Sequence, residues 1–141
     1  MTFSGLNLLG VLIAFIVSFV SGGIWFGPKT FYPVWMKARG IDPTRLNNNS
    51  KPAVLFGATA AAVLIQTLML GVIITSLQKF QPDFGVVDGA GVGLVLGVGI
   101  SAFASLSHRL FGGDGFKAWL IETANDAINL TIAGAIIAFF N

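Results

Sequence analysis

The sequence predicts an all-α integral membrane protein with four transmembrane helices in a bundle and a short amphipathic interfacial helix between the first and the second. Of its 141 residues, 55% are hydrophobic and only 10% are charged, and the mean hydropathy is +0.83. Soluble domains contain about 25% charged residues. So short a chain cannot bury this much apolar surface in a water-soluble core, whereas a bilayer accepts runs of about 20 apolar residues. We expect residues 1–141 to form a single transmembrane domain.

Four apolar runs are long enough to cross a bilayer. They cover residues 6–26, 53–77, 86–107 and 116–140. Glycines inside them are tolerated as they would not be in a soluble helix. The first run lacks the basic segment and the small-residue cleavage site of a signal peptide, and it ends in Trp25 and Phe26. We therefore expect it to remain as a mature helix.

Residues 28–39 are predicted to form the interfacial helix. Phe31, Val34, Trp35 and Ala38 follow the i, i+3, i+4, i+7 pattern of one helical face, with basic residues elsewhere. Aromatic residues suited to headgroup depth gather here, namely Trp25, Phe31, Tyr32 and Trp35. They are interpreted as membrane anchors, with the docking of a partner subunit, a pigment or a lipid headgroup as the alternative.

The distribution of Lys and Arg predicts the orientation. The connection 27–52 and the connection between the last two spans carry seven of the eight basic residues, namely Lys29, Lys37, Arg39, Arg45, Lys51, Arg109 and Lys117. By the positive-inside rule, loops 27–52 and 108–115 face the cytoplasm and both termini face outward. We expect a multi-pass protein of the bacterial inner membrane. Within the first loop, Asp42-Pro43 resembles a helix start and residues 46–52 a polar turn.

Two spans carry small residues at every fourth position. In the third span these are Gly85, Gly89, Gly93, Gly97, Ser101 and Ser105, and in the first span Gly10, Ala14, Ser18 and Gly22. Such stripes let helix backbones approach closely in lipid. They predict tight helix packing of both spans, either within one chain or between copies.

The run "GGIWFGPKTFYPVWMKARG" resembles the signature of a bacterial membrane-protein family catalogued as a domain of unknown function, number 1761. The matching residues are Gly23, Trp25, Phe26 (where the family often has Tyr), Pro28, Phe31, Trp35, Met36 and Gly40. The resemblance extends over the chain, because this family also has four spans and a last helix entered through a segment like "GFKAWLIETAND". It implies an architecture and no activity.

The fourth span carries polar residues on one face. Glu122, Asn125, Asp126 and Asn129 fall at i, i+3, i+4 and i+7. A charged carboxylate at a helix centre costs about 2.5–3.5 kcal/mol, so Asp126 should be protonated, paired or facing a polar cavity. The antiparallel third span places candidate partners at matching depths. The expected partners are Ser101 and Ser105 there, with Gln66 and Thr67 from the second span completing an intramembrane polar cluster.

This cluster has two interpretations. In the first, it is a proton or cation path, or a polar ligand pocket. In the second, it is a set of interhelical hydrogen bonds that fix the packing. The leading hypothesis is a non-catalytic protein that forms a homo-oligomer or serves as an accessory subunit of a larger membrane complex. The alternative is a small transporter or channel for protons, cations or a small polar solute, using Asp126. A weaker possibility is an enzyme acting on lipid with Glu122 and His108.

Other chemistry has little support in the sequence. There is no cysteine and a single histidine, His108, whereas catalytic zinc usually takes three protein ligands. "GAGVG" at residues 89–93 lacks the strand and the spacing of a nucleotide-binding loop. We expect no metal, no cofactor and no enzyme activity. The net charge of +2 favours anionic lipid headgroups as partners, and no nucleic acid.

Overall fold

The computed structural model describes residues 5–42 and 51–141, and the secondary structure within these ranges is helical. The helices are α1 (Leu8–Trp25), α2 (Tyr32–Ala38), α3 (Pro52–Gln78), the continuous third span of α4 (Val86–Leu94), η2 (Val95–Ala102) and α5 (Phe103–Phe111), and α6 (Gly115–Phe140). Pro43 of the expected helix start, Arg45 and most of the expected polar turn lie outside the described residues.

Four of these helices are long and apolar enough to cross a membrane, with the third taken as Val86–Phe111. The predicted fold class is therefore confirmed, including a short helix between the first two spans. This short helix, α2, begins at Tyr32 instead of residue 28. A turn precedes it, in which the Phe31 N–H donates to the Trp25 carbonyl at 3.0 Å and the Thr30 hydroxyl lies 2.7 Å from the same oxygen.

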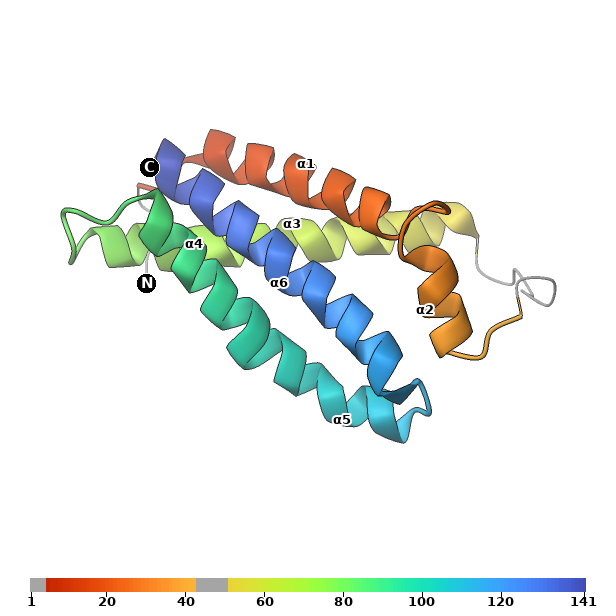
Figure 1. The fold of residues 1–141 in the computed structure, drawn as a ribbon. Coiled ribbons are helices and arrows are strands. Elements are labelled where there is room, and N and C mark those ends of the chain that lie inside the picture. The colour runs from red at the N-terminus through yellow and green to blue at the C-terminus, as the bar shows by residue number, and fades with distance from the viewer. Residues whose placement is uncertain (1–4, 43–50) are drawn as a thin grey trace.

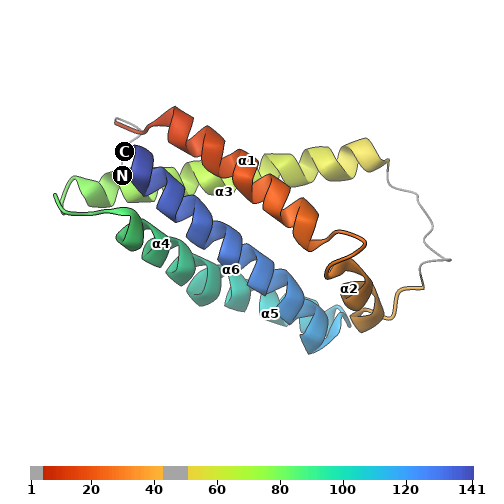
Figure 2. The same ribbon diagram turned by 45° about the horizontal axis from the view of Figure 1, so that its top comes forward.

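Helix α6 lies at the centre of the bundle. Figures 1 and 2 show α1 along one side of it and α4 to α5 along the other, with α3 crossing behind them. Nine residues of α6 are buried, more than in any other described helix. The helix that carries the predicted polar cluster is thus the one on which the others pack.

The glycine stripe of the third span packs on α6 within the chain. A Cβ atom at Gly93 would lie only 2.0 Å from the Leu130 carbonyl oxygen, and one at Gly89 only 2.4 Å from that of Gly134. The two backbones are therefore in direct contact, which only glycine allows. Gly85, the first residue of the stripe, instead precedes the helix, where its N–H donates to Asp88 Oδ2 at 2.9 Å.

The end of this stripe differs from the prediction, because η2 is a π-helix. Gly97 still packs on α6, where a Cβ atom would lie 2.7 Å from Ala127 Cα. The next buried residue of the third span is Ala102, five positions later, and Ser101 is only half-buried. A π-helix forms i→i+5 bonds, so its contact face advances by five residues and not by four. The regular spacing of the sequence gives no sign of this shift.

The small residues of the first span also face α6. A Cβ atom at Gly10 would lie 2.8 Å from Phe140 Cβ. Ala14 is completely buried, and the Ser18 hydroxyl donates to the Asn129 carbonyl at 3.5 Å. The last member of the stripe, Gly22, also faces Asn129. Members of both stripes therefore pack on α6 within the chain, which is one of the two arrangements that their spacing predicts.

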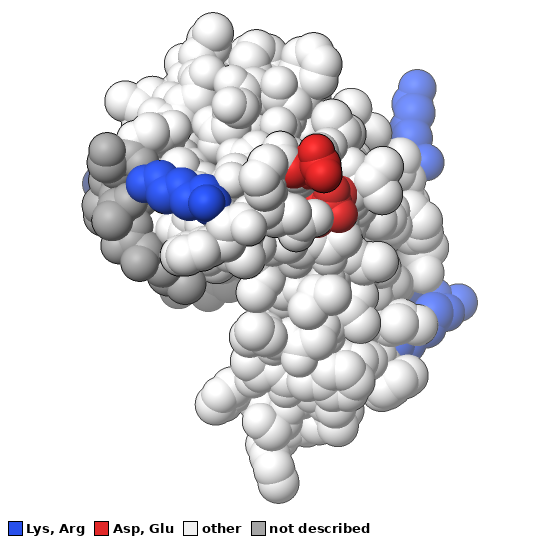
Figure 3. Space-filling view, turned by 90° about the vertical axis from the view of Figure 1, so that its left-hand side faces the viewer, with Lys and Arg blue, Asp and Glu red and all other residues white. Residues whose placement is uncertain are grey.

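The end of the bundle that holds the termini is tightly packed. Asn7 precedes α1, and its side-chain amide donates to the Phe140 carbonyl at 2.7 Å. Its backbone N–H donates to Asn141 Oδ1 at 3.0 Å, and the Asn141 amide donates to Thr75 Oγ1 at 2.8 Å. Next to them lies a core that includes Leu70, Ile74 and Ile137. Figure 3, which faces this end, shows a few charged side chains on a mostly uncharged surface.

At the opposite end, α3 separates from the bundle. Its second half contributes to the core, but residues 51–59 are all exposed. Figures 1 and 2 show α3 diverging from α6 towards its N-terminal end. This divergence opens space between α3, α1 and α6 on the side where the polar residues of α6 lie.

Candidate functional site

The space left by the divergence of α3 is a cavity of about 640 Å³. Its walls come from α1, α2, α3, α6 and the turn between α1 and α2. Polar side chains line part of it, namely Ser18, Thr59, Gln66, Thr67, Asn125, Asp126 and Asn129. Aromatic side chains line another part, namely Phe19, Phe26, Tyr32, Trp35 and Phe56. The cavity thus combines polar groups with apolar walls, as small-molecule sites do.

The polar wall is formed by a short chain of hydrogen bonds along α6. The Asn129 amide donates to Asn125 Oδ1 at 3.1 Å, and the Asn125 amide donates to Asp126 Oδ1 at 3.4 Å. Asn125 is 8% exposed, and Asn129 Oδ1 is buried without a hydrogen-bond partner in the described part of the chain. A buried polar atom without a partner is unusual in folded proteins.

Asp126 is the carboxylate of this wall, and it follows Gly115 by 11 residues in a helix of 26. At about 1.5 Å per residue it lies roughly 16 Å along the axis, near the middle of the span. Within the described ranges its hydrogen bond comes from Asn125, and no Lys, Arg or His forms an ion pair with it. Asp126 is therefore a half-buried carboxylate beside the cavity, and it forms no ion pair within the described ranges.

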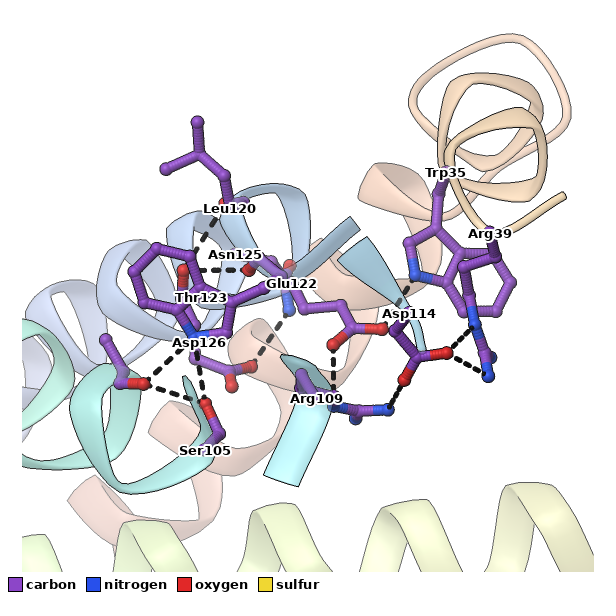
Figure 4. Close-up of polar contacts among 12 residues, drawn as sticks. Trp35, Arg39, Ser105, Arg109, Asp114, Leu120, Glu122, Thr123, Asn125 and Asp126 are labelled. Carbon is purple, nitrogen blue, oxygen red and sulfur yellow. Dashed lines mark hydrogen bonds and ion pairs between the residues drawn. The ribbon is translucent and has the colours of Figure 1, made fainter. Parts of the chain in front are cut away.

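Glu122 has a different environment, although it shares a helical face with Asp126. Its Oε2 lies 3.0 Å from Arg109 Nε, and its Oε1 accepts a hydrogen bond from Trp35 Nε1 at 2.7 Å. Figure 4 shows these contacts on one side of Glu122, away from Asp126. Glu122 is not among the cavity-lining residues. The predicted cluster therefore divides into a paired glutamate and an unpaired aspartate.

Asp114 links Arg109 to α2. Its Oδ2 lies 3.2 Å from Arg109 Nη1, and its Oδ1 lies 2.6 Å from Arg39 Nη2 and 2.7 Å from Arg39 Nε (Figure 4). Burial acts to raise the pKa of Asp114, but hydrogen bonds and charge from Arg109 and Arg39 outweigh it and hold this pKa below its ordinary value of 3.8. Together with Glu122 and Trp35 these groups form what we call the α2 latch, which fixes α2 to α5 and α6.

The aromatic side chains predicted to be membrane anchors also make contacts within the protein. Trp25 Nε1 donates to the Ile121 carbonyl at 3.2 Å, and its ring stacks on Phe31 with centroids 4.2 Å apart. Tyr32 and Trp35 stack on each other at 5.8 Å and both line the cavity. Part of the aromatic helix is therefore a wall of the site, which the sequence pattern alone did not indicate.

Ser101 and Ser105, predicted at the depths of Asp126 and Glu122, contact neither carboxylate. Ser105 accepts a hydrogen bond from Trp119 Nε1 at 3.3 Å, and the same N–H lies 3.0 Å from the Ala102 carbonyl. Ser101 does not line the cavity. The cavity is lined by α1, α2, α3 and α6, whereas the third span packs along the opposite side of α6 from α1, with Ala102 as a buried contact. Gln66 and Thr67 of α3 do line the cavity together with Asp126.

In the described ranges, no three His, Cys, Asp or Glu residues come together in a group that could hold a metal ion. His108 is exposed near the end of α5. The groups that remain for binding chemistry at this site are one carboxylate, three side-chain amides, hydroxyls and aromatic rings.

Three apolar spans packed on a fourth, central one, with a partly polar cavity beside the middle of that helix, are the features of a helical membrane protein. The chain belongs to the family described as "Protein of unknown function (DUF1761)", whose family model matches residues 9–138. The resemblance seen in the sequence is thereby confirmed, and bacterial origin stays a prediction. No curated protein and no solved structure matches the chain.

Proposed function

We propose that the protein is a small non-catalytic membrane transporter that carries a proton, a cation or a small polar solute past Asp126. One observation supports this most strongly: an unpaired carboxylate near the middle of a span lines a cavity of about 640 Å³. Ionisable residues inside a membrane are rare and usually face such pathways. A merely structural carboxylate would be expected to have a partner like the one that Glu122 has in Arg109.

The packing favours a carrier over an open channel. Leu130 and Ala133 are the cavity-lining residues of α6 closest to its C-terminal end, and one turn beyond them Ile137 is completely buried. The start of α1 and the end of α6 are joined there by the contacts of Asn7 with Phe140 and Asn141. A solute that crosses the membrane would therefore require α1, α3 and α6 to separate at that end.

Flux through proteoliposomes tests this proposal. We expect the wild-type protein to carry protons, read with a trapped pH-sensitive dye, or radiolabelled methylammonium faster than empty liposomes do. Asp126→Asn keeps the shape and removes the charge, so flux should fall about tenfold or more. Asp83→Asn, at an exposed carboxylate of the α3–α4 connection, is the matched control and should have no effect. Equal flux in the Asp126→Asn protein would remove Asp126 from the mechanism.

Water access to the cavity provides an independent test. The chain contains no cysteine, so single-cysteine variants can be labelled without background. Gln66→Cys places a thiol in the cavity, whereas the neighbouring Ile65 is 59% exposed and does not line it. A water-soluble, membrane-impermeant thiol reagent should label Gln66→Cys much faster than Ile65→Cys in lipid. Equal rates would mean that the cavity is not an aqueous path.

Assembly with itself or with a larger complex is a second candidate, favoured by the exposed start of α3. Residues 51–59 are all exposed and include the small residues Gly57 and Ala58. Small residues support helix contacts in lipid. Size measurement in mild detergent tests this idea, and a protein that stays monomeric and co-purifies with nothing would exclude it.

We also propose that the α2 end faces the cytoplasm, as the excess of Lys and Arg in connection 27–52 suggests. Lys37→Cys and Lys79→Cys lie in the connections at opposite ends. In intact cells an impermeant thiol reagent should label only Lys79→Cys. Labelling of Lys37→Cys instead would reverse the orientation. Location in a bacterial inner membrane stays a prediction.

A further inference from the structure

We propose that the solute of this cavity is a primary ammonium compound with an apolar tail, bound with its ammonium group at Asp126 and its tail along the aromatic wall. The inference rests on the proposed function, in that the cavity takes up a solute, and it names the chemical class of that solute. Charge, size and hydrogen-bonding capacity each contribute to it.

The charges near the site indicate a cation. Asp114 forms ion pairs with Arg39 and Arg109, and Glu122 forms one with Arg109, so both of these carboxylates are neutralised. Asp126 accepts a hydrogen bond from the neutral Asn125 and has no ion-pair partner in the described ranges. A carboxylate at this depth is stabilised when a cation neutralises it. An anionic solute would add a second negative charge beside the first.

The size and the lining of the cavity indicate an organic cation. A volume of about 640 Å³ is within the range of sites for small organic ligands and far exceeds a bare metal ion. No group of three potential metal ligands exists in the described ranges. Phe26, Tyr32 and Trp35 line the cavity near the α2 end. Aromatic rings attract cations electrostatically and also pack against apolar tails.

The hydrogen-bonding groups indicate a cation that carries N–H donors. The Asp126 carboxylate can only accept hydrogen bonds when ionised, so it favours a cation that can donate them. A primary ammonium group has three N–H donors in a compact head, as in lysine. A quaternary ammonium group has the same charge and no N–H, so it cannot donate a hydrogen bond to the Asp126 carboxylate, which is unfavourable in a partly buried site.

Four compounds that share a phenyl ring separate these contributions. They are 2-phenylethylammonium, its trimethylated quaternary analogue, neutral 2-phenylethanol and anionic phenylacetate. Binding to the wild-type protein in phosphatidylcholine nanodiscs is measured by calorimetry and corrected with empty nanodiscs. We expect the primary ammonium to bind about tenfold or more tightly than the quaternary analogue and the alcohol, with phenylacetate weakest. This series requires no variant, so it does not depend on how a substitution affects folding.

The Asp126→Asn protein should lose the selectivity, with primary ammonium affinity about tenfold lower and alcohol affinity unchanged. Asp83→Asn should bind all four compounds like the wild type. Equal affinities across the series, or tightest binding of phenylacetate, would overturn the inference. Suppose that Gln66→Cys is labelled and that flux requires Asp126, but that the four compounds bind equally well. The ammonium inference then fails, and the proposed transport function stands. Absence of both labelling and flux counts against the proposed function itself.

The ammonium group can come from a free amine or from the headgroup of phosphatidylethanolamine. Repeating the titration in nanodiscs that contain this lipid distinguishes the two sources. A fall of about tenfold in apparent affinity means that the lipid headgroup competes for the site. An unchanged affinity identifies a free amine as the ligand. Either result supports an ammonium site at Asp126. If 2-phenylethylammonium is the one compound of the series that does not bind in nanodiscs of phosphatidylcholine alone, the inference is contradicted.

Discussion

The two ends of the bundle are built from the same helices but in opposite ways. At the end with the termini, α1, α3 and α6 enclose completely buried side chains such as Ile74 and Ile137. At the other end, α3 departs, α2 takes its place beside α6, and the cavity remains between them. The difference teaches that close backbone contact and a polar cavity can coexist in a bundle of only four spans. The packed end holds the completely buried side chains, and the open end holds the polar groups that line the cavity.

The sharpest way to break this arrangement is to separate the third span from α6. Gly93→Ala places a Cβ atom 2.0 Å from the Leu130 carbonyl oxygen, which the contacting backbones cannot accept. We expect a loss of about 3 kcal/mol in the free energy of unfolding, the upper end of the usual range for overpacking. Gly91→Ala is the matched control, because nothing lies within 4 Å of its Cβ position. Denaturation in mild detergent measures both variants, and equal stabilities would contradict the packing described here.

This contact was partly visible in the sequence. The spacing of Gly89 and Gly93 indicated a close helix contact, because only residues on one face recur every fourth position. The partner helix was not predictable, because lipid gives no preference among apolar surfaces and both stripes turn out to face α6. The π-helix was not predictable either, since nothing in the local pattern around Gly97 departs from α-helical spacing.

The site was predictable to a similar degree. The helical period placed Asp126 beside Asn125 and Asn129, and the structure keeps them together. The α2 latch could not be predicted from the sequence, because Arg39 and Asp114 are 75 residues apart and Arg and Asp residues at loop positions are common. The cavity depends on the angle at which α3 leaves α6, which follows from packing far from the polar residues themselves. A polar stripe on one helix therefore indicates a site without revealing what closes it.

A second test sharpens the comparison at the open end. Arg109→Met removes the cation that neutralises Glu122 and supports Asp114. The side chains of Glu122 and Asp114 are only 15% and 14% exposed, so water cannot fully replace the lost contacts with Arg109. We expect the free energy of unfolding to fall by about 2 kcal/mol. Lys117→Met, an exposed residue of the same end, should change stability little. The same denaturation assay applies, and equal effects of the two substitutions would show that the α2 latch contributes nothing.

The corresponding test at the packed end is Asn7→Ala. Asn7 Oδ1 accepts from the backbone N–H groups of Leu9 and Gly10, and the amide donates to the Phe140 carbonyl. Loss of the helix cap and of the link between α1 and α6 should lower stability by about 1.5 kcal/mol. Gln81→Ala, an exposed residue in the connection after α3, is the control. The binding of 2-phenylethylammonium should survive, because Asn7 is remote from the cavity lining, and its loss would mean that the two ends are coupled.

The smallest effect is expected from pH acting on the α2 latch. The pKa of Asp114 is lowered in the folded protein, so its contribution to stability is complete above the ordinary value of 3.8 and is lost as the pH falls through the lower, folded-state value. Spin labels at Lys37→Cys on α2 and Lys117→Cys on α6 report whether α2 stays in place. We expect one narrow distance distribution at pH 6 that broadens only below about pH 4. In an Asp114→Asn background the distribution should already be broad at pH 6. A narrow distribution there would show that the Trp35 contact with Glu122 holds α2 without Asp114.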